Sequence, residues 1–429
     1  MAGAGGRPGR GFLQDWAPGV RRLPPTVGDA RLNFALDRSD VCTGIPLFCY
    51  AFGPAWPRRG SMSYSSNMLR RTFLQTLPAA AAAMTAAAAE EVPVKLGFDT
   101  YSLRAFKWKG TELLDYAAGL KLDTIQFSAL GDYGTLDAQN LQKVKDRAAQ
   151  LGISIDSGMG CICESSKAFS KNGPPARQQL IEGLRVSKAV GSRSMRCYMG
   201  SSEDRLGPLP IEAHMENTIK VFRSVRAEAM DLGVTIALEN HSGDMQAREV
   251  KTIIEASGKD LVAACLDTGN PIWCVEDPFV TLETLAPYVV TTHVRDSVVF
   301  EDARGAAGQW VALGDGNVDL VGFVRQFRKL CPKSSMQLEI ITGRPPRELP
   351  YLEADFWKAF PKMPAWEFAR FVALAKSGHP FMGAMVIEDV AGKKPAVMDE
   401  ALKEQQRIDL ERSFEYARKK LNVGVAWRG

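Results

Sequence analysis

The sequence predicts an α/β fold, a (β/α)8 barrel in which eight parallel strands alternate with helices. From residue 94 onward, short apolar runs alternate with amphipathic helical patterns over roughly 330 residues, which is the length of one large barrel. No G-x-G-x-x-G motif follows the first expected strand, so a doubly wound dinucleotide-binding sheet is not supported. We therefore expect one barrel, with a leader before it and an excursion between the eighth strand and the last helix.

The expected strands are short apolar runs that end in polar residues. They span residues 94–102, 123–128, 153–160, 194–200, 234–240, 261–269, 289–296 and 336–342. Between them lie helical patterns such as "DAQNLQKVKDRAAQLG" (137–152) and "HMENTIKVFRSVRAEAMDLG" (214–233). Each of these two ends in a glycine, which suits a helix C-cap. A last helix, "DLERSFEYARKKL" (409–421), closes the chain.

Residues 344–408 form an excursion rich in proline and aromatic residues. We expect it to cover one end of the barrel or to form an oligomer contact. A substrate lid that carries Trp357 or Trp366 is the alternative interpretation.

We divide the chain into three segments: an upstream segment (1–67), a signal segment (68–89) and the barrel (90–429). Residues 68–91 read "MLRRTFLQTLPAAAAAMTAAAAEE", which resembles a twin-arginine signal peptide with an A-x-A cleavage site. The first 67 residues contain eight arginines and ten glycines but no lysine and no glutamate, a composition that predicts disorder. We interpret them as a misassigned upstream segment, with Met68 as the native start. The protein would then be exported to the periplasm, with no membrane anchor after cleavage. The alternative is an alanine-rich helix that follows a chance arginine pair.

Composition excludes several classes of function. The net charge of +4 is small and spread out, so no nucleic-acid partner is expected. Outside the alanine-rich segment, no apolar run reaches the length of a membrane span. Of the eight cysteines, Cys42 and Cys49 lie in the leader, and Cys161 and Cys163 share one face of a strand. Without a zinc spacing, the barrel cysteines are expected to be buried free thiols.

Four chemistry-bearing residues end the last four strands: Glu239, Asp267, His293 and Glu339. In a barrel of this kind, the carboxyl ends of the strands carry the chemistry, so these side chains should point at one spot. Three carboxylates and an imidazole repel one another unless a cation lies among them. This set suits Mn²⁺, Mg²⁺ or Co²⁺, with Zn²⁺ as an alternative. Taken singly, each residue could be part of a salt bridge or a helix cap. Their occurrence on successive strands favours a metal centre.

The series "ALENH", "LDTGN", "THVRD" and "QLEI" resembles the xylose-isomerase-like superfamily of sugar isomerases and epimerases, over about residues 94–343. The resemblance implies that Glu239, Asp267, His293 and Glu339 bind a divalent metal. It also implies that Glu239 and Glu339 flank the substrate as acid and base, as in the epimerase branch. The segment "LGDGNVDL" (313–320) looks like the family's glycine-rich loop, although a plain turn with a helix N-cap explains it equally well.

The chain departs from the family at one position, because Asn270 stands where many members carry a histidine. It also has only four histidines, at positions 214, 241, 293 and 379. Endonuclease IV shares the barrel and needs several histidines around a zinc cluster, so a trinuclear DNA-repair centre is not expected here.

The expected chemistry is proton transfer through an enediolate on a non-phosphorylated sugar or keto-sugar. Returning the proton to the opposite face gives epimerisation, and returning it to the neighbouring carbon gives isomerisation. Loss of a β-oxygen or cleavage of a sugar bond makes a lyase or dehydratase, and a non-catalytic carbohydrate-binding barrel is the rival from another class. A homo-oligomer is left open. Candidate substrate contacts are Asn240, His241, Asn270, Arg295, Asp296 and Glu164, with Asp99 and Tyr101 as further lining. Trp108 is a candidate for an apolar surface against the sugar, and a core or surface tryptophan is the alternative.

Overall fold

The computed structural model describes residues 93–388 and 395–429. The chain divides into two units, Met1–Ala80 and Ala81–Gly429, and everything described belongs to the second. The predicted leader (1–67) and signal segment (68–89) lie outside the described residues, as do residues 389–394 of the excursion. No helix in the described part of the chain is long and apolar enough to cross a membrane.

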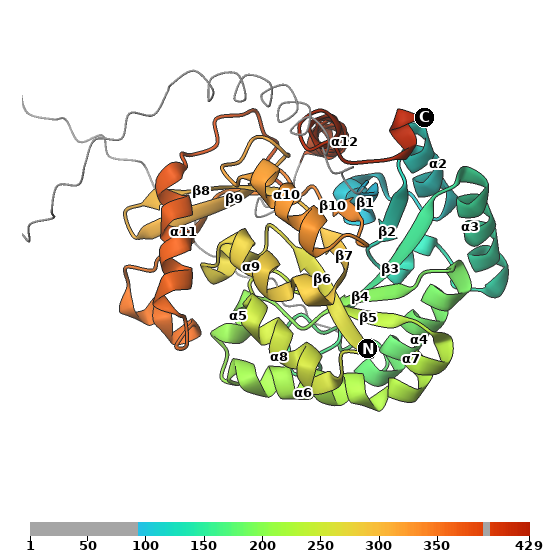
Figure 1. The fold of residues 1–429 in the computed structure, drawn as a ribbon, viewed down its shortest axis with the longest axis horizontal. Helices are drawn as coiled ribbons and strands as arrows, with labels where there is room; N and C mark the ends of the chain where they lie inside the picture. Colours follow the sequence, from blue (N-terminus) through green and yellow to red (C-terminus); the bar gives the residue numbers. More distant parts are fainter. Residues whose placement is uncertain (1–92, 389–394) are drawn as a thin grey trace, which may run out of the picture. The chain divides into compact units, whose positions relative to one another are not determined.

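Eight parallel strands form a barrel, which confirms the predicted fold (Figure 1). The sheet runs in the order β10-β1-β2-β3-β4-β5-β6-β7. It is closed between its two ends by a parallel bridge from Val294 to Leu338 and by a 2.7 Å hydrogen bond from Val294 N–H to the Gln337 carbonyl. The strands are β1 (Leu96–Asp99), β2 (Thr124–Phe127), β3 (Ser154–Cys161), β4 (Ser194–Tyr198), β5 (Thr235–Glu239), β6 (Val262–Asp267), β7 (Val289–His293) and β10 (Met336–Leu338).

Helices on the outside of the barrel connect these strands (Figure 1). The helix α3 (Ala138–Leu151) shows why they form where they do. Leu141, Val144 and Ala148 recur on one face and are buried, Asp137 caps the amino end, and Gly152 ends the helix at a φ of 68°. The others are α2 (Thr111–Gly119), α4 (Ala176–Val190), α5 (Ser202–Arg205), α6 (Ile211–Ser224), α7 (Arg226–Leu232), α8 (Ala247–Ser257), α9 (Pro278–Leu285), α10 (Leu320–Leu330) and α12 (Ala396–Lys419). Short 3₁₀ turns are η1 (Thr100–Phe106), η2 (Leu130–Tyr133), η3 (Pro271–Cys274), η4 (Ala286–Tyr288), η5 (Ala354–Ala359) and η6 (Ala426–Arg428).

The carboxyl end of every predicted strand differs from the observed one by one to four residues, and three of the wrong boundaries have a clear physical reason. The first strand ends at Asp99, because its carboxylate accepts a 2.9 Å hydrogen bond from Tyr101 N–H and starts the turn η1. The pattern at 214–233 forms two helices, α6 and α7, which meet at Val225. The last helix begins at Ala396, since residues 396–408 contain neither glycine nor proline, so the excursion ends earlier than predicted.

A second, antiparallel sheet was not predicted from the sequence. After β7 the chain forms the hairpin β8 (Asp296–Asp302) and β9 (Gly305–Val311), and the excursion adds β11 (Arg347–Leu349) to β9. The helix α11 (Ala365–Ser377) packs against β8, and Phe371 from α11 shares a buried cluster with Val299 and Trp310 of the hairpin. The excursion therefore packs on the hairpin that follows β7.

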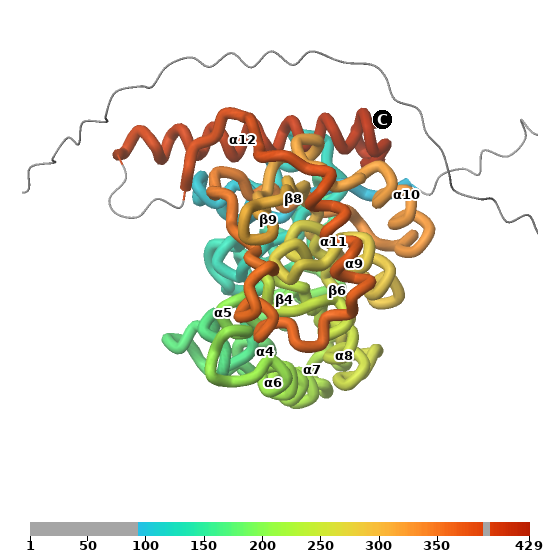
Figure 2. The backbone as a smooth tube through the Cα atoms, turned by 90° about the vertical axis from the view of Figure 1, so that its left-hand side faces the viewer, coloured from blue at the N-terminus to red at the C-terminus, as the bar shows by residue number. Residues whose placement is uncertain are grey.

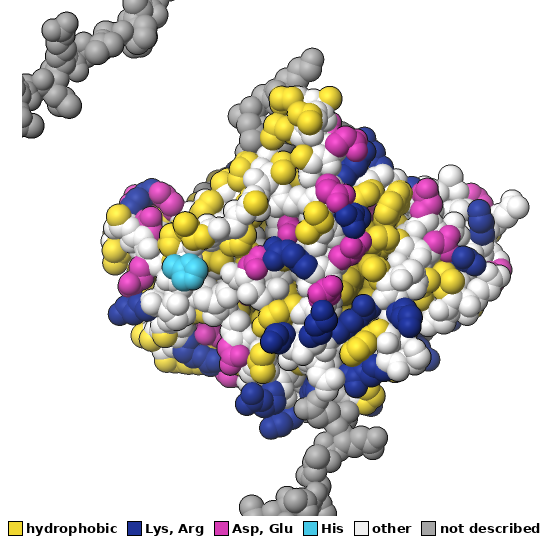
Figure 3. Space-filling view, turned by 90° about the horizontal axis from the view of Figure 1, so that it is seen from above, with side chains coloured by type: hydrophobic (Ala, Val, Ile, Leu, Met, Phe, Trp, Pro, Cys, Tyr) yellow, Lys and Arg dark blue, Asp and Glu magenta, His cyan; other side chains and the backbone are white. Residues whose placement is uncertain are grey.

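The helix α12 lies along η1 at one end of the described unit (Figure 2). On the face seen in Figure 3, Lys and Arg side chains are interspersed with Asp and Glu side chains and apolar residues. Six cysteines of the described residues, Cys161, Cys163, Cys197, Cys265, Cys274 and Cys331, are buried and free, which confirms that expectation for the barrel. Cys42 and Cys49 lie outside the described residues.

Candidate metal centre and cavity

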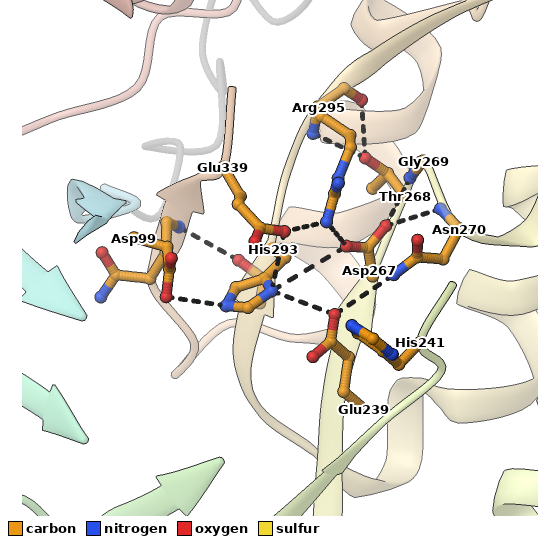
Figure 4. A network of polar contacts seen from close by, with 12 residues as sticks. Asp99, Glu239, His241, Asp267, Thr268, Gly269, Asn270, His293, Arg295 and Glu339 are labelled. Atoms are coloured by element: carbon orange, nitrogen blue, oxygen red, sulfur yellow. Dashed lines mark hydrogen bonds and ion pairs between the residues drawn. The ribbon is translucent and has the colours of Figure 1, made fainter. Parts of the chain in front are cut away.

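The structure brings the four predicted ligands to one point at the carboxyl ends of their strands (Figure 4). Glu239 ends β5, Asp267 ends β6, His293 ends β7, and Glu339 follows β10. The His293 Nδ1 atom is 3.1 Å from Glu239 Oε1, 3.1 Å from Glu339 Oε2 and 3.9 Å from Asp267 Oδ2. One ligand atom from each residue lies within 4.8 Å of the other three, which is the spacing of ligands around a single ion.

The donor set fits a divalent cation. Three carboxylates and one imidazole nitrogen, all almost fully buried, form this set, and two neighbouring arginines offset the three negative charges only in part, which burial makes costly. On the far side of the imidazole, His293 Nε2 faces Asp99 Oδ2 at 3.2 Å. A carboxylate behind a ligating histidine is the usual support of such a site, because it fixes the ring and strengthens the nitrogen as a ligand. Asp99 was expected only as pocket lining, whereas it lies behind the histidine.

Two buried arginines also meet these carboxylates. Arg196, from β4, pairs with Glu239, and Arg295, two residues beyond β7, pairs with both Asp267 and Glu339. Arg295 was a candidate, but Arg196 was missed. The available indication was a charged residue in the middle of the apolar run "SMRCYMG".

The charges shift the pKa values of the ligands in opposite directions. Burial pulls the pKa of Glu239 upward, but the guanidinium of Arg196 and the imidazole of His293 outweigh it and leave that pKa below its usual value. Burial raises the pKa of Asp267 in spite of the neighbouring Arg295. For His293, burial alone would lower the pKa, but the surrounding acidic groups raise it well above its usual value.

A cavity of about 330 Å³ opens beside the four ligands. Two aromatic rings form one wall: Tyr198 and His241 stack with centroids 3.7 Å apart and planes 17° apart. The His241 Nδ1 atom lies 2.8 Å from the Gly200 carbonyl, and burial lowers the pKa of His241 to about 4, so its ring is neutral at pH 7. The lining residues are Tyr101, Ser128, Ala129, Gly160, Arg196, Tyr198, His241, Ser242, Asn270, Arg295, Trp310, Glu339, Ile341 and Arg344.

Three of the predicted substrate contacts line this cavity: His241, Asn270 and Arg295. The Asn270 Nδ2 donates a 3.2 Å hydrogen bond to Glu239 Oε1. The Arg295 guanidinium lies 4.4 Å from the centre of the Trp310 ring. Trp310 comes from the unpredicted hairpin, so its place in the cavity could not be read from the strand pattern.

The other three predicted contacts are engaged elsewhere. The Asn240 amide exchanges two 2.9 Å hydrogen bonds with the main chain of Asp267 and so ties β5 to β6. The Asp296 carboxylate accepts hydrogen bonds from the N–H groups of Gly314 and Gly316, which fixes the glycine-rich loop 313–320. Glu164 is exposed and accepts a 2.7 Å hydrogen bond from Ala176 N–H at the start of α4.

The remaining aromatic candidates divide in the same way. Tyr101 lines the cavity, whereas Trp108 packs against Phe106, 4.4 Å between ring centres, and against Tyr116. Trp357 donates a 2.8 Å hydrogen bond to the Tyr351 carbonyl, and Trp366 is 57% exposed. Neither Trp357 nor Trp366 belongs to the cavity lining.

Comparison with known proteins agrees with the barrel fold. A family model described as a xylose isomerase-like TIM barrel matches residues 114–360. The 3-oxo-isoapionate decarboxylase of Pectobacterium atrosepticum is 25% identical over 211 residues, which cover 47% of this chain and 68% of that protein. The uncharacterised protein YihM of Escherichia coli is 24% identical over 215 residues, which cover 48% of this chain and 59% of that protein.

Among solved structures, D-psicose 3-epimerase from Clostridium cellulolyticum H10 with D-tagatose superimposes with a TM-score of 0.48 at 15% identity. The match covers 76% of this chain and 99% of that one. A xylose isomerase domain protein from Planctomyces limnophilus gives a TM-score of 0.45 at 19% identity, over 60% of this chain and 91% of that one. With TM-scores below 0.5, these likenesses support no functional conclusion.

Proposed function

The chain belongs to the xylose isomerase-like TIM barrel family. We propose that it is a divalent-metal-dependent enzyme that forms an enediolate on a sugar or keto-sugar. The observation that carries the proposal is the convergence of Glu239, Asp267, His293 and Glu339 beside a cavity of about 330 Å³. A cavity of this size, with polar groups and two stacked rings on its wall, suits a small polyhydroxylated substrate. Mn²⁺, Mg²⁺ and Co²⁺ suit the ligands best.

The chemistry begins at a carbon beside a carbonyl group. A divalent cation in this site would draw electrons toward the carbonyl oxygen and stabilise the negative charge of the enediolate. Glu339, on the cavity wall, accepts the proton from that carbon and returns it. Arg295 lies against Glu339 and supplies a second positive charge next to the developing oxyanion. The two stacked rings exclude water from one side of the substrate.

Isomerisation and epimerisation share this first step. In a decarboxylase, cleavage of a carbon–carbon bond forms the enediolate by loss of carbon dioxide instead of a proton. Such a reaction needs only the step that protonates the carbon beside the carbonyl. The relative named 3-oxo-isoapionate decarboxylase favours this lyase reaction as the second candidate, since it is 25% identical over 211 residues. Our first choice remains an isomerase-type reaction on a non-phosphorylated sugar. The choice of a non-phosphorylated substrate depends on export through the twin-arginine pathway, which stays a prediction.

Solvent hydrogen exchange tests the proposal. The protein is loaded with Mn²⁺ and incubated in D₂O with a panel of ketoses, 3-keto-glycosides and 3-oxo sugar acids, and deuterium beside the carbonyl is followed by NMR. We expect at least one sugar to exchange. In Glu339→Gln, exchange should fall about 10²–10⁴-fold, the usual contribution of a general base, while Mn²⁺ still binds.

The matched control is Glu276→Gln, because Glu276 is an equally buried glutamate outside the cavity. This variant should keep the wild-type exchange rate. If a sugar binds in equilibrium dialysis but none exchanges or is cleaved, the enzymatic proposal fails, and the protein is a non-catalytic carbohydrate-binding barrel.

A further inference from the structure

The two glutamates of the metal centre differ in their access to the cavity. Glu339 lines the cavity together with Arg196, whereas Glu239 is not among the lining residues and is 0% exposed. A group that exchanges a proton with a substrate must come within hydrogen-bond reach of it. The two glutamates therefore cannot serve as an equivalent pair of bases on this cavity.

Both oxygens of Glu239 are already engaged. Its Oε2 atom contacts Nε and Nη2 of Arg196, the two nitrogens on one edge of the guanidinium group. Oε1 accepts a 3.2 Å hydrogen bond from Asn270 Nδ2 and lies 3.1 Å from His293 Nδ1, at the point where a cation would be ligated. Neither oxygen is left to carry a substrate proton, with or without an ion on Oε1.

Arg196 is itself held in place, so Glu239 cannot easily be released. Its Nη1 donates a 3.2 Å hydrogen bond to the Met159 carbonyl, and its guanidinium carbon lies 4.9 Å from the centre of the Tyr198 ring. Tyr198 is paired with Glu239 in the register of β4 and β5, and Arg196 lies two residues earlier on the same face of β4. The strand pairing thus fixes the arginine over the glutamate.

Glu339 has the opposite arrangement. Its Oε2 meets Arg295 Nη2 and lies 3.1 Å from His293 Nδ1. Its Oε1 has no hydrogen-bond or ion-pair partner among residues 93–388 and 395–429, and the residue faces the cavity. One oxygen can therefore accept and return a proton while the other stays in the metal centre.

We propose that Glu339 is the one glutamate of this pair that exchanges protons with the substrate, and that Arg196 is a positioning residue that withholds Glu239. The inference rests on the proposed function and deepens it. Glu339 Oε1 takes a proton from the carbon beside the carbonyl. The C–H electron pair becomes the new C=C bond, and the carbonyl π electrons move to oxygen. The carbon that loses this proton carries a hydroxyl group, whose own proton then passes to the neighbouring oxygen, the former carbonyl oxygen. The same carboxyl returns the carbon-derived proton to the former carbonyl carbon on the same face, so the carbonyl moves by one carbon.

A base on one face alone cannot invert a carbon centre, because inversion needs a proton donor on the opposite face. The proposal therefore selects isomerisation, and it disfavours epimerisation by Glu239 and Glu339 acting as two opposed bases. The protein would differ in this respect from what its resemblance to the epimerase branch implies.

The first experiment does not depend on turnover. The folded protein is treated with a water-soluble carbodiimide and glycine methyl ester, and the peptides that contain Glu239 and Glu339 are quantified by mass spectrometry. We expect Glu339 to be labelled about tenfold faster or more, since labelling of Glu239 requires three hydrogen-bonding partners to move away. In Arg196→Met the labelling rate of Glu239 should rise toward that of Glu339. In Arg196→Lys the labelling rate of Glu239 should lie between its rates in the wild type and in Arg196→Met. Equal labelling of the two glutamates in the wild type overturns the proposal, even if both variants fail to fold.

The matched control is Arg205→Met, because Arg205 forms a similar buried arrangement away from the cavity. It pairs with Glu249, donates a 2.9 Å hydrogen bond to the Ala359 carbonyl and lies 4.7 Å from the centre of the Phe360 ring. This variant should leave the labelling of Glu239 unchanged. If it raises Glu239 labelling as much as Arg196→Met does, a general loosening of the fold explains the effect and the proposal is wrong.

The second experiment uses product stereochemistry. Mn²⁺-loaded wild type is incubated in D₂O with the same panel, and each product is assigned by NMR as an isomer or an epimer. We expect isomers without epimers from the wild type, and epimers to appear with Arg196→Met. An epimer as the main wild-type product, with deuterium at the inverted carbon, overturns the proposal. If no member of the panel exchanges or is cleaved, the proposed function fails, and the labelling experiment alone decides how Arg196 and Glu239 are related.

Discussion

Replacing Asp99 by asparagine should weaken metal binding without disturbing the fold. The Asp99 Oδ2 atom lies 3.2 Å from His293 Nε2, and both residues are 0% exposed. Two full charges at that distance would interact by about 5 kcal/mol at an effective dielectric constant of 20. A ligating imidazole is neutral and gains only part of this energy, so we expect the usual effect of such a partner. That effect is about 10- to 100-fold in metal affinity, or about 1.4–2.7 kcal/mol.

The asparagine keeps the local turn, because its Oδ1 can still accept the hydrogen bond from Tyr101 N–H. The assay is isothermal titration of metal-stripped protein with Mn²⁺ at constant pH, and urea unfolding checks the fold. Asp137→Asn is the control, since Asp137 caps α3 through the same type of backbone hydrogen bond, 2.9 Å from Asn140 N–H, but lies far along the chain from the site. An Asp99→Asn affinity within about twofold of the wild type would refute the reasoning.

Three further predictions concern the surroundings of the site. Burial raises the pKa of Asp244 to about 8, above its value of about 3.9 in an unfolded chain. The protonated carboxyl therefore contributes its full share to the free energy of unfolding below pH 4, and this contribution is lost as the pH rises through 8. In Asp244→Asn, the free energy of unfolding measured by urea titration should no longer decrease in this way between pH 5 and 8. The same pH dependence in the variant and the wild type would contradict the raised pKa of Asp244. Burial lowers the pKa of His241 to about 4, so its ring proton resonances in NMR should not titrate between pH 6 and 8; a midpoint near 6.5 would contradict the burial. A side chain at Gly316 would overlap the Asp296 carboxylate, so Gly316→Ala should cost about 1–3 kcal/mol of unfolding free energy, and a change below 0.5 kcal/mol would argue against a rigid loop.

The barrel and its ligand set were predictable because both depend on local patterns. Each strand is an apolar run, and Glu239, Asp267 and His293 stand where three of those runs turn polar. Parallel pairing then brings neighbouring strand ends together without further information from the sequence. The convergence of the four side chains follows from the topology alone.

The partners of those ligands could not be predicted in the same way. Arg196 lies in the middle of an apolar run, and the sequence does not say that its guanidinium crosses to Glu239 on the next strand. Asn240 and Asp296 follow ligand-bearing strands in the same manner as Arg295, yet their side chains turn to backbone groups. Which polar side chain faces a cavity and which one ties a loop is decided by packing across strands.

The hairpin β8–β9 was missed because "VVTTHVRD" and the residues after it read as one strand and a loop. The run from Asp296 to Val311 pairs with itself in an antiparallel arrangement and is completed by β11, about 35 residues later in the chain. Trp310 reaches the cavity through this hairpin. Pairing between distant segments leaves no short-range pattern that periodicity could detect.

A count of bound metal tests the metal centre most directly. Metal-stripped protein is titrated with Mn²⁺, and free Mn²⁺ is followed by electron paramagnetic resonance. We expect one strong Mn²⁺ site per chain, lost in the double variant Asp267→Ala with His293→Ala and retained in Glu276→Gln. Thermal unfolding should agree, with about 2.7 kcal/mol of stabilisation at a Mn²⁺ concentration 100 times the Kd. A wild type that binds no divalent cation, or a double variant that binds Mn²⁺ as tightly as the wild type, would contradict the assignment of this centre.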